Sequence, residues 1–123
     1  FEEGARWRQA AEEAGLGIIQ LVTPVTSEER LRMLCEASRG FVYAVTITGI
    51  TGAKGLPAGL MDYLSTVGKS SSAPVCAGFG IRTAADIERL VGHCDGAVIG
   101  SAYIDAVEQG VSPSDFVKAL LGA

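Results

Sequence analysis

The sequence predicts an α/β fold, the C-terminal half of a (β/α)8 TIM barrel with four parallel βα units plus a leading and a trailing helix. A short apolar run, a turn rich in Gly, Thr, Ser or Pro, and a helical pattern recur four times. Strands that are separated by helices must lie parallel. The 123 residues are about half of the ~250 residues of a full barrel. An open doubly wound sheet is the alternative that four such units also allow.

Composition places the chain among globular proteins and excludes two classes of partner. With 48% hydrophobic and 20% charged residues, we expect one domain over 1–123, strands 5–8 of a barrel. The apolar runs are far shorter than the ~20 residues that cross a bilayer, so no membrane association is expected. The ten Lys and Arg residues are scattered and the net charge is −4, which argues against nucleic acid.

The cysteines bear on the cellular location of the protein, and the first residue bears on whether the chain is a segment. Three cysteines without a C-x-x-C pair favour a reducing, cytoplasmic location. The chain begins with Phe1 and shows no signal-peptide pattern, and we expect it to be a segment of something longer.

The first elements follow from capping signals and apolar spacing. A helix is predicted over 2–14, ended by Gly15, and then a strand over 17–22. The next helix is predicted to begin at Thr26, with Glu29 completing a capping box. Its apolar stripe is Leu31, Leu34 and Cys35.

The second and third units follow the same plan. A strand over 41–45 is followed by a long loop over 46–55, and Pro57 is predicted to start a helix. A strand over 73–77 precedes a helix capped by Thr83. The apolar stripes of these two helices are Leu60, Leu64 and Val67, then Ile87, Leu90 and Val91.

The last unit carries a strand over 96–99 and a short helix over 103–108 that stops at Gly110. Ser112 and Pro113 then have the residue types of an N-cap and first helical position. The stripe of this last helix is Phe116, Val117 and Leu120.

Glycines at three successive strand ends predict a phosphate site. Backbone N–H groups at a glycine turn before a helix can approach an anion closely. Barrels often bind phosphate after their last two strands, here at Gly80-Ile81 and at Gly100-Ser101-Ala102. The alternative is that these glycines only form turns. The loop over 46–55 is either a closing lid or an ordinary solvent loop.

Other reactive residues have simpler interpretations. His93-Cys94-Asp95 precedes a strand, which places it at the end opposite the predicted site, and Cys76 is expected to be a small core residue. Lys54 is expected to be solvated, and Phe79 either covers an aromatic ligand or joins the core. No strand end carries a carboxylate, and no general acid–base pair is visible.

Four stretches together resemble the α subunit of tryptophan synthase. They are the segments over 23–31, 40–52, 74–81 and 95–102, which include the letters GITG, GFGI and GSA. Each stretch alone is weak evidence for this resemblance, but all four together at these intervals are specific for the family. The likeness covers the whole chain as the C-terminal half of that family. Two positions depart from the family pattern: Thr46 stands where the family usually has Ser, and Ile47 where it often has a charged residue.

The resemblance implies a barrel that cleaves indole-3-glycerol phosphate to indole and glyceraldehyde 3-phosphate by a retro-aldol reaction, and passes indole to a β subunit. It implies that the mobile lid carries Thr51, which engages a catalytic aspartate on closure. The lid also takes part in communication with the β subunit. The other residues that the resemblance implies are Gly52, Gly80, Gly100 and Ser101 for the substrate phosphate, and Tyr43 and Phe79 for the indole pocket.

The same resemblance places the catalytic glutamate and aspartate in the other half of the family's chain. No catalytic residue is therefore expected here, and the segment alone should bind phosphate weakly without turnover. No metal or cofactor is implied, because pyridoxal phosphate belongs to the β subunit. Two alternatives stay open: another phosphate-binding barrel, such as a phosphoribosyl isomerase or thiamine phosphate synthase, and a non-catalytic half-barrel binding module that pairs with a second copy.

Overall fold

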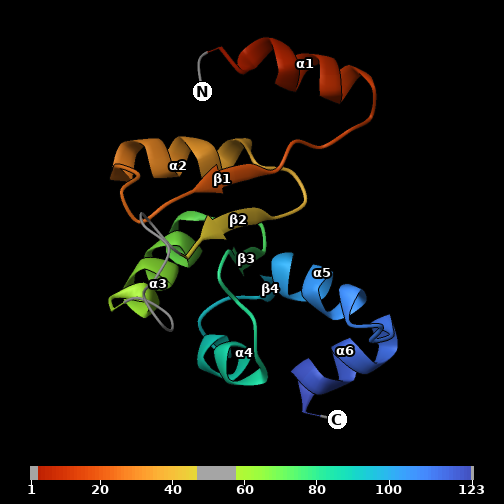
Figure 1. Ribbon diagram of the computed structural model, residues 1–123. Helices are drawn as coiled ribbons and strands as arrows, with labels where there is room; N and C mark the ends of the chain where they lie inside the picture. The colour runs from red at the N-terminus through yellow and green to blue at the C-terminus, as the bar shows by residue number, and fades with distance from the viewer. Residues whose placement is uncertain (1–2, 47–57, 123) are drawn as a thin grey trace.

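The computed structural model describes residues 3–46 and 58–122, and it shows a parallel four-stranded sheet in the order β1-β2-β3-β4 (Figure 1). Each strand is followed by a helix, as the repeated pattern predicts. The elements are α1 (Ala5–Glu13), β1 (Gln20–Val22), α2 (Glu28–Ala37), β2 (Val42–Val45), α3 (Leu60–Ser70), β3 (Val75–Gly78), α4 (Ala84–Leu90), β4 (Gly96–Val98), α5 (Ser101–Glu108) and α6 (Pro113–Leu121).

One face of the sheet is packed against helices. Ala44 pairs with Val22 on β1 and with Ala77 on β3, and all three side chains are fully buried. The helices α2 and α3 pack on β1 and β3 and on each other. The predicted stripes Leu31, Leu34 and Cys35 of α2, and Leu60, Leu64 and Val67 of α3, are buried in this core.

The other face of the sheet is only partly covered. Side chains alternate between the two faces of a strand, so the residues between the buried ones point to the opposite side. We call this side the open face; it carries Leu21, Tyr43, Val45, Cys76 and Val98. Leu21 is 58% exposed, and the other four are half-buried. In a barrel this face lines the interior, where further strands would cover it.

Cys76 therefore differs from its prediction. It lies in β3 as expected, but it is on the open face and half-buried, whereas its neighbours Val75 and Ala77 form the core. The sequence shows a continuous apolar run because both faces of a barrel strand are apolar.

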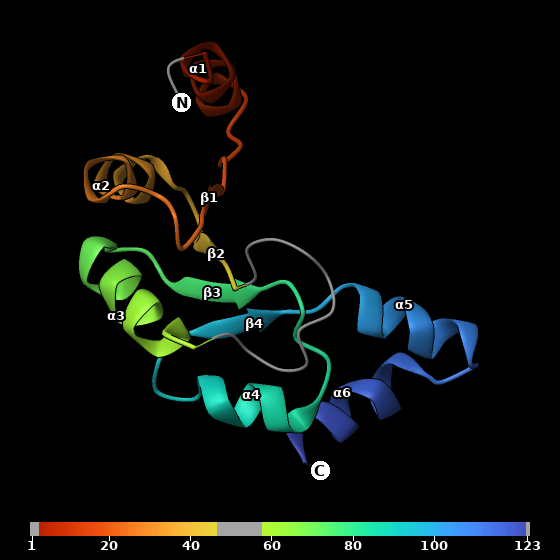
Figure 2. The ribbon, with the colours of Figure 1, turned by 60° about the vertical axis from the view of Figure 1, so that its left-hand side comes forward.

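The terminal helices differ in their packing. None of the residues of α1 is buried, and Figure 1 shows it standing apart beyond α2. At the other end, α6 packs on α4 and α5 (Figure 2). The rings of Tyr103 and Phe116 meet with centroids 5.3 Å apart.

Some local predictions are wrong. Val117, which the sequence predicts to lie in the apolar stripe of the last helix, is 50% exposed. The N-cap of α2 is Ser27, one residue after Thr26, because the Thr26 hydroxyl instead accepts a hydrogen bond from the Thr23 N–H at 2.9 Å. Helix α5 begins at Ser101 rather than Tyr103. Val91 is 71% exposed, because α4 ends at Leu90 and Val91 leaves the helical stripe.

The caps of the last helices are as predicted. Thr83 and Asp86 form a reciprocal capping box at α4, and the Ser112 hydroxyl accepts from the Asp115 N–H with Pro113 at the start of α6. The predicted helix start at Pro57 lies outside the described residues. In residues 3–46 and 58–122, every helix is too short or too polar to cross a membrane.

Candidate functional site

The carboxyl ends of β3 and β4 lie side by side, because the two strands are paired in parallel. The loops that follow them, over 79–83 and 99–100, therefore share one end of the sheet. A side-chain contact joins them: Arg82 Nη1 donates to Ser101 Oγ at 3.2 Å. The structure thus brings Ser101 to the loop that contains Gly80, as the sequence predicts.

The start of α5 has features that suit an anion. Gly100 is its N-cap, and a glycine has no side chain with which to cap the helix. Its first turn carries no acidic residue, whereas α2, α3, α4 and α6 each have at least one there. The first N–H groups of a helix have no intrahelical acceptor and carry a partial positive charge. A phosphate could therefore accept hydrogen bonds at Gly100 and Ser101 without displacing a carboxylate.

The loop after β3 has an unusual backbone. Both Phe79 and Gly80 have left-handed conformations, with φ of 81° and 79°. This region costs little for Gly but about 1 kcal/mol or more for Phe. Phe79 is 56% exposed. The alternative prediction that it joins the core is therefore wrong.

Thr46 holds this loop from the end of β2. Its side chain is fully buried, and its N–H donates to the Gly78 carbonyl at 2.9 Å. The Thr46 hydroxyl lies 2.8 Å from the same oxygen and also within hydrogen-bond reach of the Phe79 carbonyl. Because N–H and C=O point in opposite directions across a trans peptide, fixing the Phe79 carbonyl turns the Gly80 N–H away from Thr46.

Tyr43 lies over the same strand end. A Cβ on Gly78 would be 2.3 Å from the Tyr43 hydroxyl oxygen, so the ring lies across the backbone of Gly78. Tyr43 is half-buried on the open face and lies next to Gly78, which precedes Phe79. This position is compatible with an aromatic pocket at the carboxyl end of the sheet.

Asp86 fixes the start of α4 below this loop. One of its carboxylate oxygens accepts from the N–H groups of Arg82 and Thr83, each at 3.0 Å, and from the Thr83 hydroxyl. Partial burial acts to raise the pKa of Asp86, but these hydrogen bonds and the charge of Arg89 outweigh it and hold the pKa below its ordinary value. The ionised carboxylate therefore orders the segment that leads from Gly80 into α4.

The structure describes only part of the phosphate site and indole pocket that the sequence predicts. Gly80, Gly100 and Ser101 share one end of the sheet with Phe79 and Tyr43, whereas Thr51 and Gly52 lie outside the described residues, as do Lys54 and most of the predicted lid. The contacts of Arg82, Gly78 and Thr46 at this end of the sheet were not predicted from the sequence. Only the GFG turn and the following cation hinted at them, since they are set by tertiary structure.

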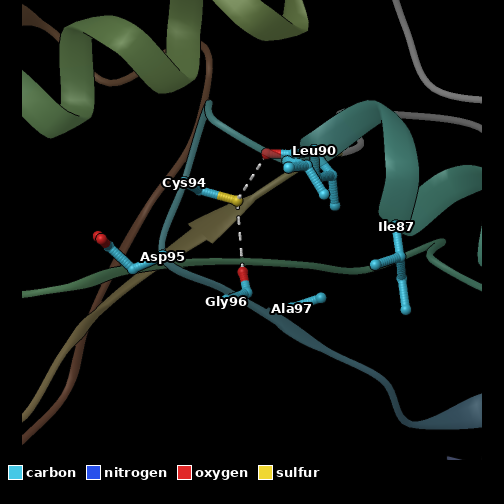
Figure 3. Close-up of a pocket in the computed structure, with 7 residues that line it drawn as sticks. Ile87, Leu90, Cys94, Asp95, Gly96 and Ala97 are labelled. Carbon is cyan, nitrogen blue, oxygen red and sulfur yellow. Dashed lines mark hydrogen bonds between the residues drawn. The ribbon is translucent and has the colours of Figure 1, made fainter. Parts of the chain in front are cut away.

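His93, Cys94 and Asp95 lie at the opposite end of the sheet, as predicted. Cys94 Sγ lies 3.8 Å from the Leu90 carbonyl and 3.4 Å from that of Gly96, at a hollow of about 150 Å³ (Figure 3). Burial raises the pKa of the Cys94 thiol and outweighs the backbone hydrogen bonds that lower it. Asp95 accepts from the Val75 N–H at 2.8 Å. A protonated thiol and a bonded carboxylate make a structural cluster rather than a nucleophile.

Comparison with known proteins agrees with this arrangement. Residues 1–120 match the family model described as Tryptophan synthase alpha chain. Proteins of that name are 41% identical over 108 residues in Carboxydothermus hydrogenoformans, covering 87% of this chain and 40% of that protein, and 36% identical over 126 residues in Geobacter sulfurreducens, covering 97% and 48%. The chain spans less than half the length of these two relatives.

Solved structures give the same result for the fold. The tryptophan synthase α2β2 complex from Pyrococcus furiosus matches with a TM-score of 0.82 and 27% identity, covering 98% of this chain and 51% of that one. An open form of tryptophan synthase from M. tuberculosis matches with a TM-score of 0.77 and 31% identity, covering 97% and 44%. The four βα units therefore correspond to about half of these larger chains.

Proposed function

The chain belongs to the tryptophan synthase alpha chain family, and we propose that it supplies the phosphate site and lid of an enzyme that cleaves indole-3-glycerol phosphate. In this proposal the chain is the C-terminal half of a longer (β/α)8 barrel. The products are indole and glyceraldehyde 3-phosphate, formed by a retro-aldol reaction. The enzyme class is a carbon–carbon lyase.

The observation that carries the proposal is the shared position of the loops after β3 and β4. Arg82 joins them at Ser101, and the start of α5 has neither a side-chain cap nor an acidic residue in its first turn. A phosphate monoester needs several N–H donors together with positive potential, and both are present there. We assign Gly80, Gly100 and Ser101 to the substrate phosphate, together with Gly52 from the lid.

The remaining roles follow from the position of the aromatic residues. Tyr43 on the open face and exposed Phe79 lie at the same end of the sheet. We assign them to the indole pocket, since flat aromatic surfaces stack well on aromatic side chains. The acid and base that cleave the carbon–carbon bond come, in this proposal, from the other half of the barrel. Thr51 then supports lid closure over the bound substrate.

The proposal extends to the partner and the location. The Pyrococcus furiosus relative is solved as an α2β2 complex, and we propose that this chain likewise works with a β subunit. Pyridoxal phosphate belongs to that subunit, and we assign no cofactor to this chain. The described cysteines Cys35, Cys76 and Cys94 are free thiols, which supports a reducing cytoplasmic location.

Gly100→Asp in the complete enzyme tests the proposal. A Cβ at Gly100 would meet none of the described residues within 4 Å, and the φ of −117° suits any residue, so the variant should fold. We expect it to abolish measurable binding of glycerol 3-phosphate and cleavage of indole-3-glycerol phosphate, because a carboxylate would repel the phosphate. The control is Ser72→Asp, which adds the same charge at an exposed residue before β3, at the opposite end of the sheet.

The proposal is wrong if the unaltered complete enzyme does not cleave indole-3-glycerol phosphate. The phosphate assignment alone is wrong if the unaltered enzyme cleaves the substrate and Gly100→Asp binds glycerol 3-phosphate as tightly as Ser72→Asp does.

A further inference from the structure

Arg82 connects the two predicted phosphate-binding loops through its side chain. It follows the GFGI segment directly in sequence, yet its guanidinium reaches Ser101, nineteen residues further along the chain. One nitrogen, Nη1, donates to Ser101 Oγ at 3.2 Å. The other, Nη2, forms an ion pair with Asp105 Oδ2. Its position is therefore set by two residues that lie one turn apart on α5.

This position places a positive charge within reach of the bound anion. A hydroxyl–oxygen hydrogen bond is about 2.7–2.8 Å long, so a phosphate oxygen on Ser101 Oγ lies no more than about 6 Å from Arg82 Nη1. This is shorter than the screening length of about 8 Å at physiological ionic strength. A rotation of the Arg82 side chain towards the phosphate would shorten this distance.

Asp105 competes with the phosphate for Arg82. Both side chains of the ion pair are 49% exposed, so the pair is weak and can open at little cost. A phosphate dianion carries more charge than a carboxylate and accepts two parallel N–H donors from guanidinium. The bound phosphate is therefore the stronger acceptor of the two.

We propose that Arg82 is a binding residue for the substrate phosphate. Asp105 holds the Arg82 side chain in place until the phosphate arrives. The proposal rests on the proposed function, because it takes Ser101 as a phosphate ligand. When the dianion occupies the site, the guanidinium turns from Asp105 towards it. Asp105 acts through Arg82 and is a positioning residue that lowers phosphate affinity.

A purely structural ion pair between the loop and α5 would behave differently. In that case, removing either partner would loosen the same contact, and both variants would lose thermal stability with similar effects on binding. In the proposed mechanism the two variants change phosphate affinity in opposite directions. The sign of the Asp105→Asn effect therefore separates the two roles.

The test measures the Kd for glycerol 3-phosphate by calorimetry, with melting temperatures for each variant of the complete enzyme. We expect Arg82→Gln to weaken binding about tenfold, and Arg82→Lys to weaken it less because the charge remains. Asp105→Asn should tighten binding about two- to threefold. In the double variant Arg82→Gln/Asp105→Asn this gain should disappear, because Asp105 then has no arginine to hold. The matched control is Arg32→Gln, which removes an exposed arginine that pairs with Glu28 on α2 and should change Kd less than twofold.

Three results would overturn the proposal. One is an unchanged Kd in Arg82→Gln while Gly100→Asp abolishes binding, which leaves the proposed function intact. Another is weaker binding in Asp105→Asn, which indicates a structural pair. The third is a gain from Asp105→Asn that persists in the double variant, which indicates simple charge repulsion. If the unaltered enzyme itself binds no glycerol 3-phosphate, the proposed function fails first.

Discussion

A methyl group at Gly78 should destabilise the fold through one side chain, that of Tyr43. The added Cβ would lie 2.3 Å from the Tyr43 hydroxyl oxygen and 2.4 Å from its Cζ, whereas carbon atoms in contact are about 3.5–4.0 Å apart. The ring must therefore move by more than about 1 Å. Overpacking of this kind costs about 1–3 kcal/mol. Because Tyr43 is only half-buried, the ring can move towards the open face, and we expect about 1–2 kcal/mol for Gly78→Ala.

Urea unfolding followed by circular dichroism measures this loss. With a slope of about 2 kcal/mol per M, in the middle of the usual range, the midpoint should fall by about 0.5–1 M at an unchanged slope. Gly68→Ala is the matched control. Gly68 lies within α3, where a Cβ would meet no described residue within 4 Å, so the same change should stabilise by about 0.5–1 kcal/mol.

A second variant identifies Tyr43 as the cause. In a Tyr43→Ala background the obstructing ring is gone, so the cost of Gly78→Ala should largely disappear. A neutral Gly78→Ala variant would refute the reasoning, as would a cost that is unchanged when Tyr43 is alanine.

Three further predictions concern the same end of the sheet. Thr46→Val should cost about 1 kcal/mol in urea unfolding, because it removes the buried hydroxyl at the Gly78 and Phe79 carbonyls; Thr46→Ser should recover most of that loss, and an equal loss in both variants would contradict the hydrogen-bond argument. Phe79→Gly should stabilise by about 0.5–1 kcal/mol, because φ of 81° suits glycine, and should raise the KM for indole-3-glycerol phosphate; reduced stability would show that the Phe79 ring contributes packing. Asp86→Ala should cost about 1 kcal/mol at pH 7 through loss of the capping box. Because the pKa of folded Asp86 lies below its ordinary value of about 3.8, this difference should persist above about pH 4 and shrink as the pH falls through the folded pKa; a difference that stays constant down to pH 2 would exclude the ionised carboxylate as its source.

The sequence predicted those parts of the structure that depend on neighbouring residues. The four βα units, the buried stripes of α2 and α3, and the caps at Thr83 and Ser112 follow from patterns within a few residues. The position of Gly80 and Ser101 at one end of the sheet also followed, since parallel strands have their carboxyl ends together. Capping at Ser27 rather than Thr26 was missed, because both residues have a suitable hydroxyl and the Thr23 turn decided between them.

Tertiary structure decided which distant residues meet at the candidate site. Thr46 reaches the Gly78 and Phe79 carbonyls, Tyr43 covers Gly78, and Arg82 reaches Ser101. Each of these contacts joins two different strands or their loops, and it depends on strand register. The packing of whole helices against the sheet sets that register, and the local pattern of apolar residues does not encode it. The alternation between core and open face has the same origin, because the strands are apolar on both sides and only the helices determine which side is buried.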